Sequence, residues 1–362
     1  MRLNMHKLKN KFKRLFMSAA TIGTACLLAG CGAGAAAGTD NSSVTESQSG
    51  VNGSEQENAS SDSQKLQIVA TIFPEYDWVK EILGDQVENV DLTLLLGNGT
   101  DMHSFQPTME DILKVSTCDL FIYVGGESDS WVADALKGAG NPDRKAINLM
   151  DVLGDQVKEE ELVEGMQDED DHTHEEGHTH DDDLEYDEHV WLSLKNAEVL
   201  VNAISASLQE LDPDSKDTYA ANSDAYVKKL SALDADYQAA VDAASNKTVL
   251  FGDRFPFRYL VDDYGLSYYA AFVGCSAETE AGFETISFLA KRVDELKLPC
   301  VLTIEGAQHK IAETIVRNTT AKNQRVLTMD SMQSTTSKDV KNGTTYLSVM
   351  EKNLSVLKEA LR

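Results

Sequence analysis

The 362-residue sequence is poor in basic side chains, with 32 Lys and Arg residues against 60 Asp and Glu residues. Its formal net charge at pH 7 is −28. A protein of this charge repels nucleic acid and anionic lipid and attracts cations. We therefore expect no nucleic-acid partner, and cations are the first class of ligand to consider.

Cysteine is scarce as well, and the hydrolase motif GxSxG is missing. Beyond residue 31 the cysteines are Cys118, Cys275 and Cys300. No two of them form a CxxC pair, which excludes zinc-ribbon and thioredoxin-type motifs. Cys118 and Cys300 each lead into an apolar run and are predicted to be buried. The spacing permits a disulfide between Cys275 and Cys300 without requiring one. The absence of GxSxG argues against a serine hydrolase.

Apolar runs of membrane length are absent after residue 30, so no segment there is expected to span a bilayer. The first thirty residues have the features of a secretory signal, with a basic start that lacks acids and a short apolar run over 15–30. The sequence Leu28-Ala29-Gly30-Cys31 resembles a bacterial lipobox, in which cleavage precedes a cysteine that receives lipid. We predict a signal peptide over 1–30 and lipidation at Cys31. The alternative is an ordinary signal peptide followed by a chance cysteine.

Residues 31–64 are predicted to form a flexible linker, because Gly, Ala, Ser, Asn, Gln and Glu dominate them and large apolar side chains are nearly absent. Removing residues 1–30 takes away six basic residues and no acidic one, so the formal charge would fall from −28 to −34. Together these features predict a monomeric protein that lipid holds at the extracytoplasmic face of a bacterial cell membrane.

The most unusual composition occurs in an acidic loop predicted over 160–188. From Asp168 to Glu188 there are twelve carboxylates and no Lys or Arg. Such polar side chains cannot form a core, so a solvated loop is predicted. Imidazole and carboxylate groups suit borderline divalent ions such as Zn²⁺, and the His-x-His pairs favour auxiliary metal capture over a merely solubilising role. The histidines of this loop are His172, His174, His178 and His180.

From residue 66 onward, short apolar runs alternate with amphipathic segments, which predicts an α/β fold with mostly parallel sheets flanked by helices. Four candidate strands precede a long central insert and four follow it. We therefore expect an N-terminal lobe over 65–212, a linking helix over 213–246 and a C-terminal lobe over 247–362. The candidate strands are Leu66–Ala70, Val90–Leu96, Leu120–Val124, Ala146–Leu149, Thr248–Phe251, Leu266–Ala270, Val301–Ile304 and Arg325–Thr328.

The insert has one apolar stripe at helical spacing from Tyr219 to Ala240. It predicts a helix of about 30 residues from near Ser215 to near Ala244, which would span roughly 45 Å. The segment contains no Gly or Pro. We therefore expect a rigid helix that braces both lobes.

Two histidines outside the acidic loop occupy positions suited to ligation. His103 follows a candidate strand, and ligands of open α/β sheets bind beyond the carboxyl ends of strands. His189 directly precedes a predicted helix. A lone histidine is usually a surface or core residue, but two at such positions beside a metal-collecting loop favour metal binding.

Two patterns surround these histidines, G-x-x-x-H-S-x-x-P and, in part, D-x-H-x-W-L. They resemble motifs of the zinc- and manganese-specific solute-binding lipoproteins of ABC transporters, and the acidic His-rich loop is typical of the zinc-handling members. The resemblance covers nearly all of residues 66–362 and implies two α/β lobes, a rigid joining helix and one metal ion in the cleft. The matching residues are Gly99, His103, Ser104, Pro107, Asp187, His189, Trp191 and Leu192.

One ligand position departs from the family pattern. Where the family places a His or Glu ligand, this chain reads FGDRFPFRYLVDDYGL and has Arg254, which offers no lone pair and cannot ligate. The resemblance then implies Asp253 as third ligand, with Arg254 turned toward a carboxylate. It implies Asp330, in the segment TMDS, as a further ligand, although Asp330 also fits a helix cap. The alternatives to Asp253 are Glu278, Glu280 and Glu305.

The function that the resemblance implies is capture of Zn²⁺ and its delivery to a membrane ABC permease and its ATPase, without enzymatic activity. The alternatives are a Mn²⁺ receptor, an adhesin-type metal-binding lipoprotein and, less favoured, a zinc hydrolase. A ligand shell richer in carboxylates would shift the preference toward Mn²⁺. The long helix between two similar lobes favours the transport receptor.

Overall fold

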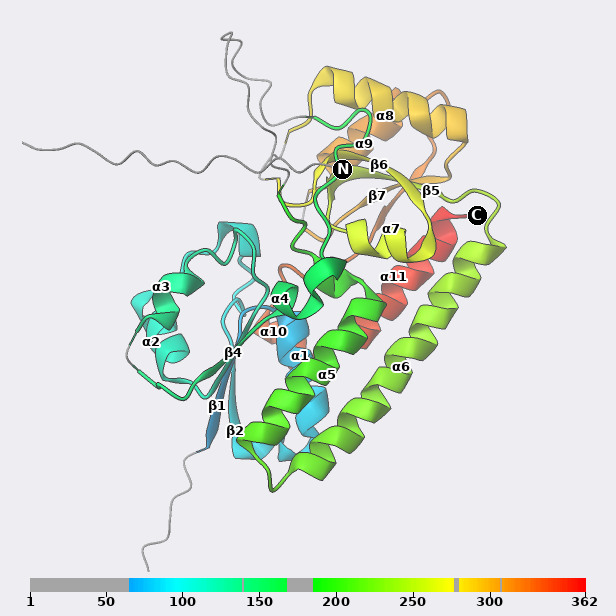
Figure 1. Ribbon diagram of the computed structural model, residues 1–362. Coiled ribbons are helices and arrows are strands. Elements are labelled where there is room, and N and C mark those ends of the chain that lie inside the picture. The colour runs from blue at the N-terminus through cyan, green and yellow to red at the C-terminus, as the bar shows by residue number, and fades with distance from the viewer. Residues whose placement is uncertain (1–64, 139, 168–184, 277–279, 307) are drawn as a thin grey trace, which may run out of the picture. The chain divides into compact units, whose positions relative to one another are not determined.

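The computed structural model describes residues 65–138, 140–167, 185–276, 280–306 and 308–362, all within one structural unit, Asp62–Arg362. These residues form two four-stranded parallel sheets flanked by helices (Figure 1). The fold class expected from the sequence is therefore confirmed. Within the described ranges, no helix has both the length and the apolar character needed to cross a membrane.

The first sheet has the strand order β2-β1-β3-β4. Its central strands, β1 and β3, bury most of their side chains, which is why they appear in the sequence as continuous apolar runs. The strands are β1 (Leu66–Ala70), β2 (Val90–Leu94), β3 (Leu120–Tyr123) and β4 (Lys145–Asn148), and the helices of this lobe are α1 (Phe73–Leu83), α2 (Met109–Thr117), α3 (Val132–Leu136), α4 (Leu149–Leu153) and α5 (Leu194–Leu211).

The second sheet has the strand order β6-β5-β7-β8. Its strand β5 runs four residues beyond its expected end at Phe251, and its pairing with β6 shifts register between Phe251 and Arg254. Asp253 and Arg254 thus belong to a strand and not to a loop. The elements of this lobe are β5 (Thr248–Phe255), β6 (Ser267–Val273), β7 (Cys300–Thr303), β8 (Arg325–Thr328), α7 (Arg258–Tyr264), α8 (Phe283–Leu296), α9 (Lys310–Asn318), α10 (Ser337–Lys341) and α11 (Tyr346–Ala360).

The expected linking helix is confirmed as α6 (Lys216–Ala243), a helix of 28 residues. At 1.5 Å per residue it spans about 42 Å. It packs against α1 and α5 of the first lobe and against α7 and α11 of the second. Figure 1 shows α6 running beside α5 and continuing to the second lobe.

The start of α11 joins the second lobe to the first. The backbone N–H of Tyr346 donates to the carboxylate of Asp77 at 2.8 Å, and its hydroxyl donates to the carbonyl of Trp191 at 2.6 Å. The Tyr346 ring also packs edge-on against Trp78, with ring centroids 5.2 Å apart. The side chains of Trp78, Trp191 and Tyr346 belong to one hydrophobic core that includes residues of both lobes. The shared core fixes the loops that carry the site.

Candidate metal-binding site

The loops of the site follow strand ends or precede a helix. His103 lies in a 3₁₀ turn, Met102–Ser104, after β2, and the Asp101 carboxylate caps this turn by accepting the His103 N–H at 3.1 Å. His189 precedes a second 3₁₀ turn, Val190–Leu192, at the approach to α5, and it is fully buried. Cys275 comes two residues after the end of β6.

The rings of His103 and His189 face each other through their Nε2 atoms, which are 3.1 Å apart. The Nδ1 atom of His103 lies 2.8 Å from the Ser128 hydroxyl and 3.5 Å from the Glu188 carboxylate. The Nδ1 atom of His189 lies 2.9 Å from the Asp187 carboxylate. Metal-ligating histidines are commonly held in this way through their second nitrogen. The two Nε2 atoms are therefore the candidate ligand atoms.

The electrostatics of the pair differ between the two rings. Burial, and after it the charge of His189, lower the pKa of His103 to about 3. Burial also opposes the charged form of His189, but the charge of Asp187 and its hydrogen bond outweigh burial and raise the pKa of His189. One proton between the facing nitrogens satisfies both rings, because one ring then donates and the other accepts. A divalent ion can take the place of that proton.

Two glycines allow close packing around these histidines. A Cβ atom on Gly274 would lie 2.9 Å from Cε1 of His189, which is closer than real Cβ contacts. A Cβ atom on Gly126 would lie 2.3 Å from the Glu188 carboxylate, and Gly126 also has a positive φ of 78°. The absence of a side chain at Gly274 lets the end of β6 pack on the His189 ring and brings Cys275 to the site.

Cys275 lies beside the two histidines, although the sequence interpretation did not propose it as a ligand. Within the described ranges, one group of three or more His, Cys, Asp or Glu residues has all its donor atoms within 4.8 Å of one another, and it consists of His103, His189 and Cys275. The sequence had suggested Cys275 only for a disulfide with Cys300, yet both residues are free thiols. Cys300 begins β7 and Cys275 follows the end of β6, so these parallel strands, with β5 between them, place the two at opposite ends of the sheet.

The surroundings of Cys275 are acidic. Its backbone N–H donates to the Glu160 carboxylate at 3.0 Å. Burial raises the pKa of the Cys275 thiol well above its usual range, and the charges of Glu160, Asp187 and Glu188 raise it further. Burial likewise raises the pKa of Glu160. Without a cation the thiol stays protonated, whereas a bound dication would deprotonate a coordinating thiol.

Arg254 crosses between the lobes beside this group. Its Nη2 donates to the Asp101 carboxylate at 2.5 Å, and its Nη1 donates to the carbonyl of Ser276 at 3.3 Å. The guanidinium thus turns toward a carboxylate, as expected, but that carboxylate belongs to the first lobe. Asp101 also holds the His103 backbone, so Arg254 links the loops that carry His103 and Cys275.

The structure does not place Asp253 with the two histidines. One oxygen of its carboxylate accepts the N–H of Arg254 at 2.9 Å, and the other accepts the N–H of Ile304 at 3.3 Å. The physical reason is the extension of β5, because Asp253 lies within the extended strand and its carboxylate faces the end of β7. The expectation that Asp253 supplies the third ligand is not supported by this position.

The other predicted carboxylate ligands also lie outside the group of three. Asp330 accepts the N–H of Met332 at 2.8 Å and so stabilises its own turn. Burial, and then the charge of Glu305, raise the pKa of Asp330 to about 6. Glu305 accepts hydrogen bonds from the Ser331 hydroxyl and from the Ser331 and Gln333 backbones. Glu280 is exposed. The remaining predicted residues, Glu278, His172, His174, His178, His180 and Cys31, lie outside the described residues.

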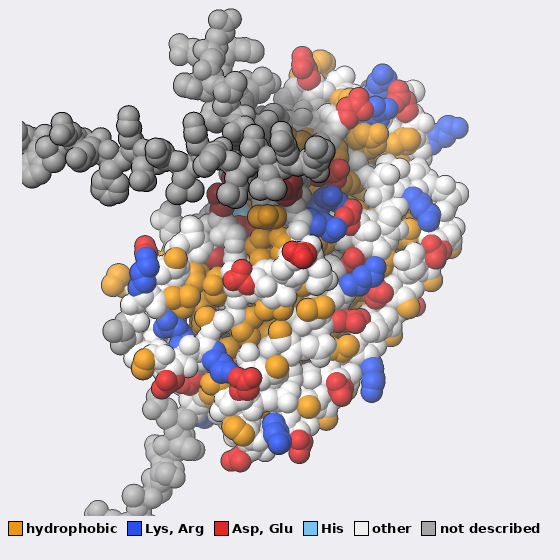
Figure 2. All heavy atoms as spheres, in the orientation of Figure 1, with side chains coloured by type: hydrophobic (Ala, Val, Ile, Leu, Met, Phe, Trp, Pro, Cys, Tyr) orange, Lys and Arg blue, Asp and Glu red, His pale blue; other side chains and the backbone are white. Residues whose placement is uncertain are grey.

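A cavity of about 1520 Å³ reaches the group at Cys275. Its lining includes Glu160 and also Gln167 and Glu185, the described residues that flank 168–184. Carboxylates dominate its charged side chains, namely Asp151, Asp155, Glu159, Glu160, Glu161 and Glu185 against Lys158 and Arg258. On the face shown in Figure 2, acidic and basic side chains are interspersed over the rest of the described surface. An acidic cavity of this kind attracts cations toward the site.

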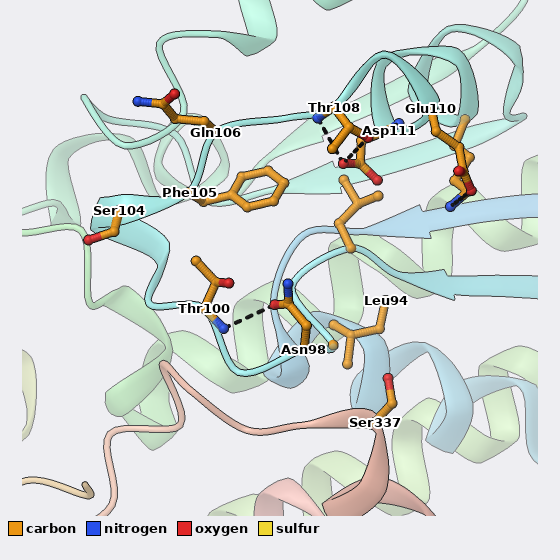
Figure 3. Close-up of a pocket in the computed structure, with 13 residues that line it drawn as sticks. Leu94, Asn98, Thr100, Ser104, Phe105, Gln106, Thr108, Glu110, Asp111 and Ser337 are labelled. Carbon is orange, nitrogen blue, oxygen red and sulfur yellow. Dashed lines mark hydrogen bonds and ion pairs between the residues drawn. The ribbon is translucent and has the colours of Figure 1, made fainter.

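A second cavity, of about 610 Å³, lies beside the start of α2 (Figure 3). Asn98, Thr100 and Phe105 line it. Thr108 caps α2 there by accepting the N–H of Asp111, whose carboxylate accepts from Thr108 in return. Its lining includes Ser104, the neighbour of His103, but not His103, His189 or Cys275.

Comparisons with known proteins agree with this architecture. The family described as zinc-uptake complex component A, periplasmic, matches residues 68–360. The zinc-binding lipoprotein AdcA of Streptococcus pneumoniae serotype 4 is 34% identical over 295 residues, which cover 82% of this chain and 56% of AdcA. The chain therefore spans about half the length of this relative. The high-affinity zinc uptake system protein ZnuA of Bacillus subtilis is 30% identical over 310 residues, which cover 86% of this chain and 92% of ZnuA.

A solved structure shows the same likeness in three dimensions. The Zn(II)-bound ZnuA-like domain of Streptococcus pneumoniae AdcA superposes with a TM-score of 0.62 at 29% identity and covers 82% of this chain and 99% of that domain. The matched family consists of binding components of an uptake complex and is not defined by a reaction, which agrees with the expectation that the chain is not an enzyme. Because the family match extends over most of the chain, the chain belongs to the family of zinc-uptake complex component A.

Proposed function

We propose that this protein captures Zn²⁺ between its lobes through His103 and His189 and delivers the ion to a membrane ABC permease and its ATPase. The observation that carries the proposal is the pair of Nε2 atoms 3.1 Å apart, with both Nδ1 atoms held by other side chains. Zinc–nitrogen bonds of about 2.0–2.1 Å in a tetrahedral shell separate two nitrogens by about 3.3 Å. The rings therefore need to move little to hold the ion.

The relatives support zinc as the transported ion, because AdcA is named for zinc binding and the ZnuA protein of Bacillus subtilis for zinc uptake. The donor set supports it as well. Imidazole suits Zn²⁺, whereas Mn²⁺ prefers carboxylate, carbonyl and water ligands. Asp253 and Asp330, the two carboxylates that would have enriched the shell in oxygen, bond to backbone N–H groups instead.

The remaining parts of the proposal rest on the sequence. The signal-like residues 1–30 and the lipobox-like Cys31 support a lipid-anchored monomer at the extracytoplasmic face, and residues 31–64 would let the body reach the permease. The histidines within 168–184 support an auxiliary role in collecting ions. The bounds of α5, α6 and β5 support a division into lobes 65–212 and 247–362 with the linking helix at 213–246.

Calorimetric titration with Zn²⁺ tests this function. In a variant that lacks residues 168–182, His103→Ala and His189→Ala should each abolish the tight site or weaken it severely, because each leaves the shell incomplete. His309→Ala, which changes a histidine before α9 and outside the group of three, is the matched control and should bind zinc normally. Unchanged affinity in both His103→Ala and His189→Ala would refute the proposed site.

A further inference from the structure

The third ligand of the family is missing from its expected place in this chain. Arg254 occupies that position, and it donates hydrogen bonds to the Asp101 carboxylate and the Ser276 carbonyl. A guanidinium has no lone pair to give to a metal. A site with only two imidazoles would hold zinc weakly, since protein zinc sites use three or four protein ligands. Another side chain is therefore needed beside His103 and His189.

Cys275 has the geometry to fill this gap. Its sulfur and one donor atom from each histidine all lie within 4.8 Å of one another. In a tetrahedral shell, a zinc–sulfur bond of about 2.3 Å and zinc–nitrogen bonds of about 2.0–2.1 Å place sulfur and nitrogen about 3.6 Å apart. The sulfur therefore has to close by about 1.2 Å at most. A side-chain rotation and a small loop shift can cover this distance.

Several contacts hold Cys275 at this position, so it is not an isolated surface thiol. Gly274 packs on the His189 ring, and a Cβ atom there would come within 2.9 Å of that ring. The Cys275 N–H donates to Glu160 at 3.0 Å. The next carbonyl, that of Ser276, accepts from Arg254. The residue that replaces the family's ligand thus helps to position the side chain that can take over its role.

The charges around the sulfur also suit a dication. Asp187 and Glu188 hold the two histidines, and Glu160 holds the Cys275 backbone. Arg254 bonds two of these loops, and the cavity lining adds the cations Lys158 and Arg258. Cys275 and Glu160 both line the acidic cavity, so an ion that enters there meets the sulfur. A fourth tetrahedral position remains for Glu160 or water.

We infer that Cys275 binds the captured ion as a thiolate and completes a site of two imidazoles and one sulfur, in place of the family's third ligand. The inference rests on the proposed zinc function and deepens it. On binding, the thiol proton and the proton shared by the imidazoles leave to solvent, and no redox change occurs. A thiolate favours Zn²⁺ and softer ions such as Cd²⁺ over Mn²⁺.

X-ray absorption at the zinc edge, on the processed protein loaded with one equivalent of Zn²⁺, tests the inference. We expect one sulfur scatterer at about 2.3 Å, distinct from nitrogen and oxygen at about 2.0–2.1 Å. Residues 168–188 contain no sulfur, so an ion held there cannot produce this signal. Cys275→Ser should remove the sulfur signal, whereas Cys118→Ser and Cys300→Ser, at the two buried thiols of the described body, should retain it.

The same variants separate the inference from the proposed function. Cys275→Ser should lower zinc affinity by roughly tenfold or more. The loss of a ligand should cost at least as much affinity as the loss of a residue that only positions a ligand. The substitution should lower Cd²⁺ affinity more than Mn²⁺ affinity. If the wild type shows no sulfur scatterer while zinc binding still requires His103 and His189, the inference fails and the proposed function stands. A sulfur signal that survives in Cys275→Ser overturns the inference as well. Normal zinc binding in both histidine variants would instead overturn the proposed function.

Discussion

Substitutions of Asp187 test whether a residue that only positions the proposed ligand His189 contributes to zinc affinity. It is 2% exposed, and one of its carboxylate oxygens accepts both the backbone N–H of His189 at 2.8 Å and its Nδ1–H at 2.9 Å. This oxygen fixes the ring so that Nε2 faces His103. Asp187→Ala removes both hydrogen bonds, whereas Asp187→Asn keeps an acceptor oxygen and removes only the charge.

The expected losses follow from that difference. Removal of the carboxylate that supports a metal-ligating histidine typically costs 10- to 100-fold in metal affinity, or about 1.4–2.7 kcal/mol. Asp187→Ala should lie near the upper end of that range and Asp187→Asn near the lower end. Since the charge of Asp187 raises the pKa of His189, Asp187→Asn should also lower that pKa in the metal-free protein.

Zinc titration against a competing chelator gives the affinities, and an NMR titration of the His189 ring gives its pKa. Asp253→Asn is the matched control, because Asp253 bonds only backbone N–H groups in the structure and an amide oxygen can still accept from them. It should leave zinc affinity unchanged. The reasoning is refuted if both Asp187 variants bind zinc as tightly as the wild type, or if Asp253→Asn alone loses affinity.

Three further predictions concern other parts of the molecule. Gly274→Ala should weaken zinc binding roughly tenfold, because the added Cβ displaces the His189 ring. Gly282→Ala, whose Cβ would meet only Gln167 at 3.3 Å, should leave zinc binding unchanged, and calorimetry on both variants tests this. Deleting residues 168–182 should leave the melting temperature of the metal-free protein and the affinity of the tight zinc site nearly unchanged, while fewer weakly held ions bind. A large decrease in melting temperature would contradict this prediction. Burial, and then the charge of Asp129, raise the pKa of Glu75 to about 8 from 4.5. The folded state therefore binds this proton more firmly than the unfolded state does. As the pH rises from about 5 to about 8, the free energy of unfolding should decrease by at most about 1.4 kcal/mol per pH unit. Urea unfolding at several pH values measures this dependence. Glu75→Gln should make the decrease in the free energy of unfolding smaller, whereas Glu81→Gln on the same helix should not. An unchanged pH dependence in Glu75→Gln would contradict the prediction.

The sheets could be predicted because buried parallel strands leave a strong local signal. β1 and β8 have the predicted bounds, and the other strands begin or end within a few residues of them. Most strands contain a short apolar run, and alternation with helices implies parallel pairing. The stripe from Tyr219 to Ala240 located α6 for the same reason.

The end of β5 could not be predicted in this way. Residues 252–255 read GDRF and lack the apolar pattern of a buried strand. They are held in the strand by pairing with β6 across a register shift, which is a tertiary interaction. That extension directs the Asp253 carboxylate to Ile304 and Arg254 to Asp101.

His103 and His189 could be proposed because recognisable motifs surround them, but Cys275 has no such motif. It lies far along the chain from both histidines, and only the packing of Gly274 on the His189 ring brings it near. The one indication in the sequence was Arg254, which stands where the family has a His or Glu ligand. It implies that another nearby side chain replaces that ligand. The sequence alone does not say which side chain that is.

Anomalous diffraction at the zinc edge, from crystals of the protein with one equivalent of Zn²⁺, tests the central claim most directly. The account predicts one strong peak within bonding distance of the Nε2 atoms of His103 and His189 and of the Cys275 sulfur. A peak bound by Asp253 or Asp330 and remote from the two imidazoles would contradict it.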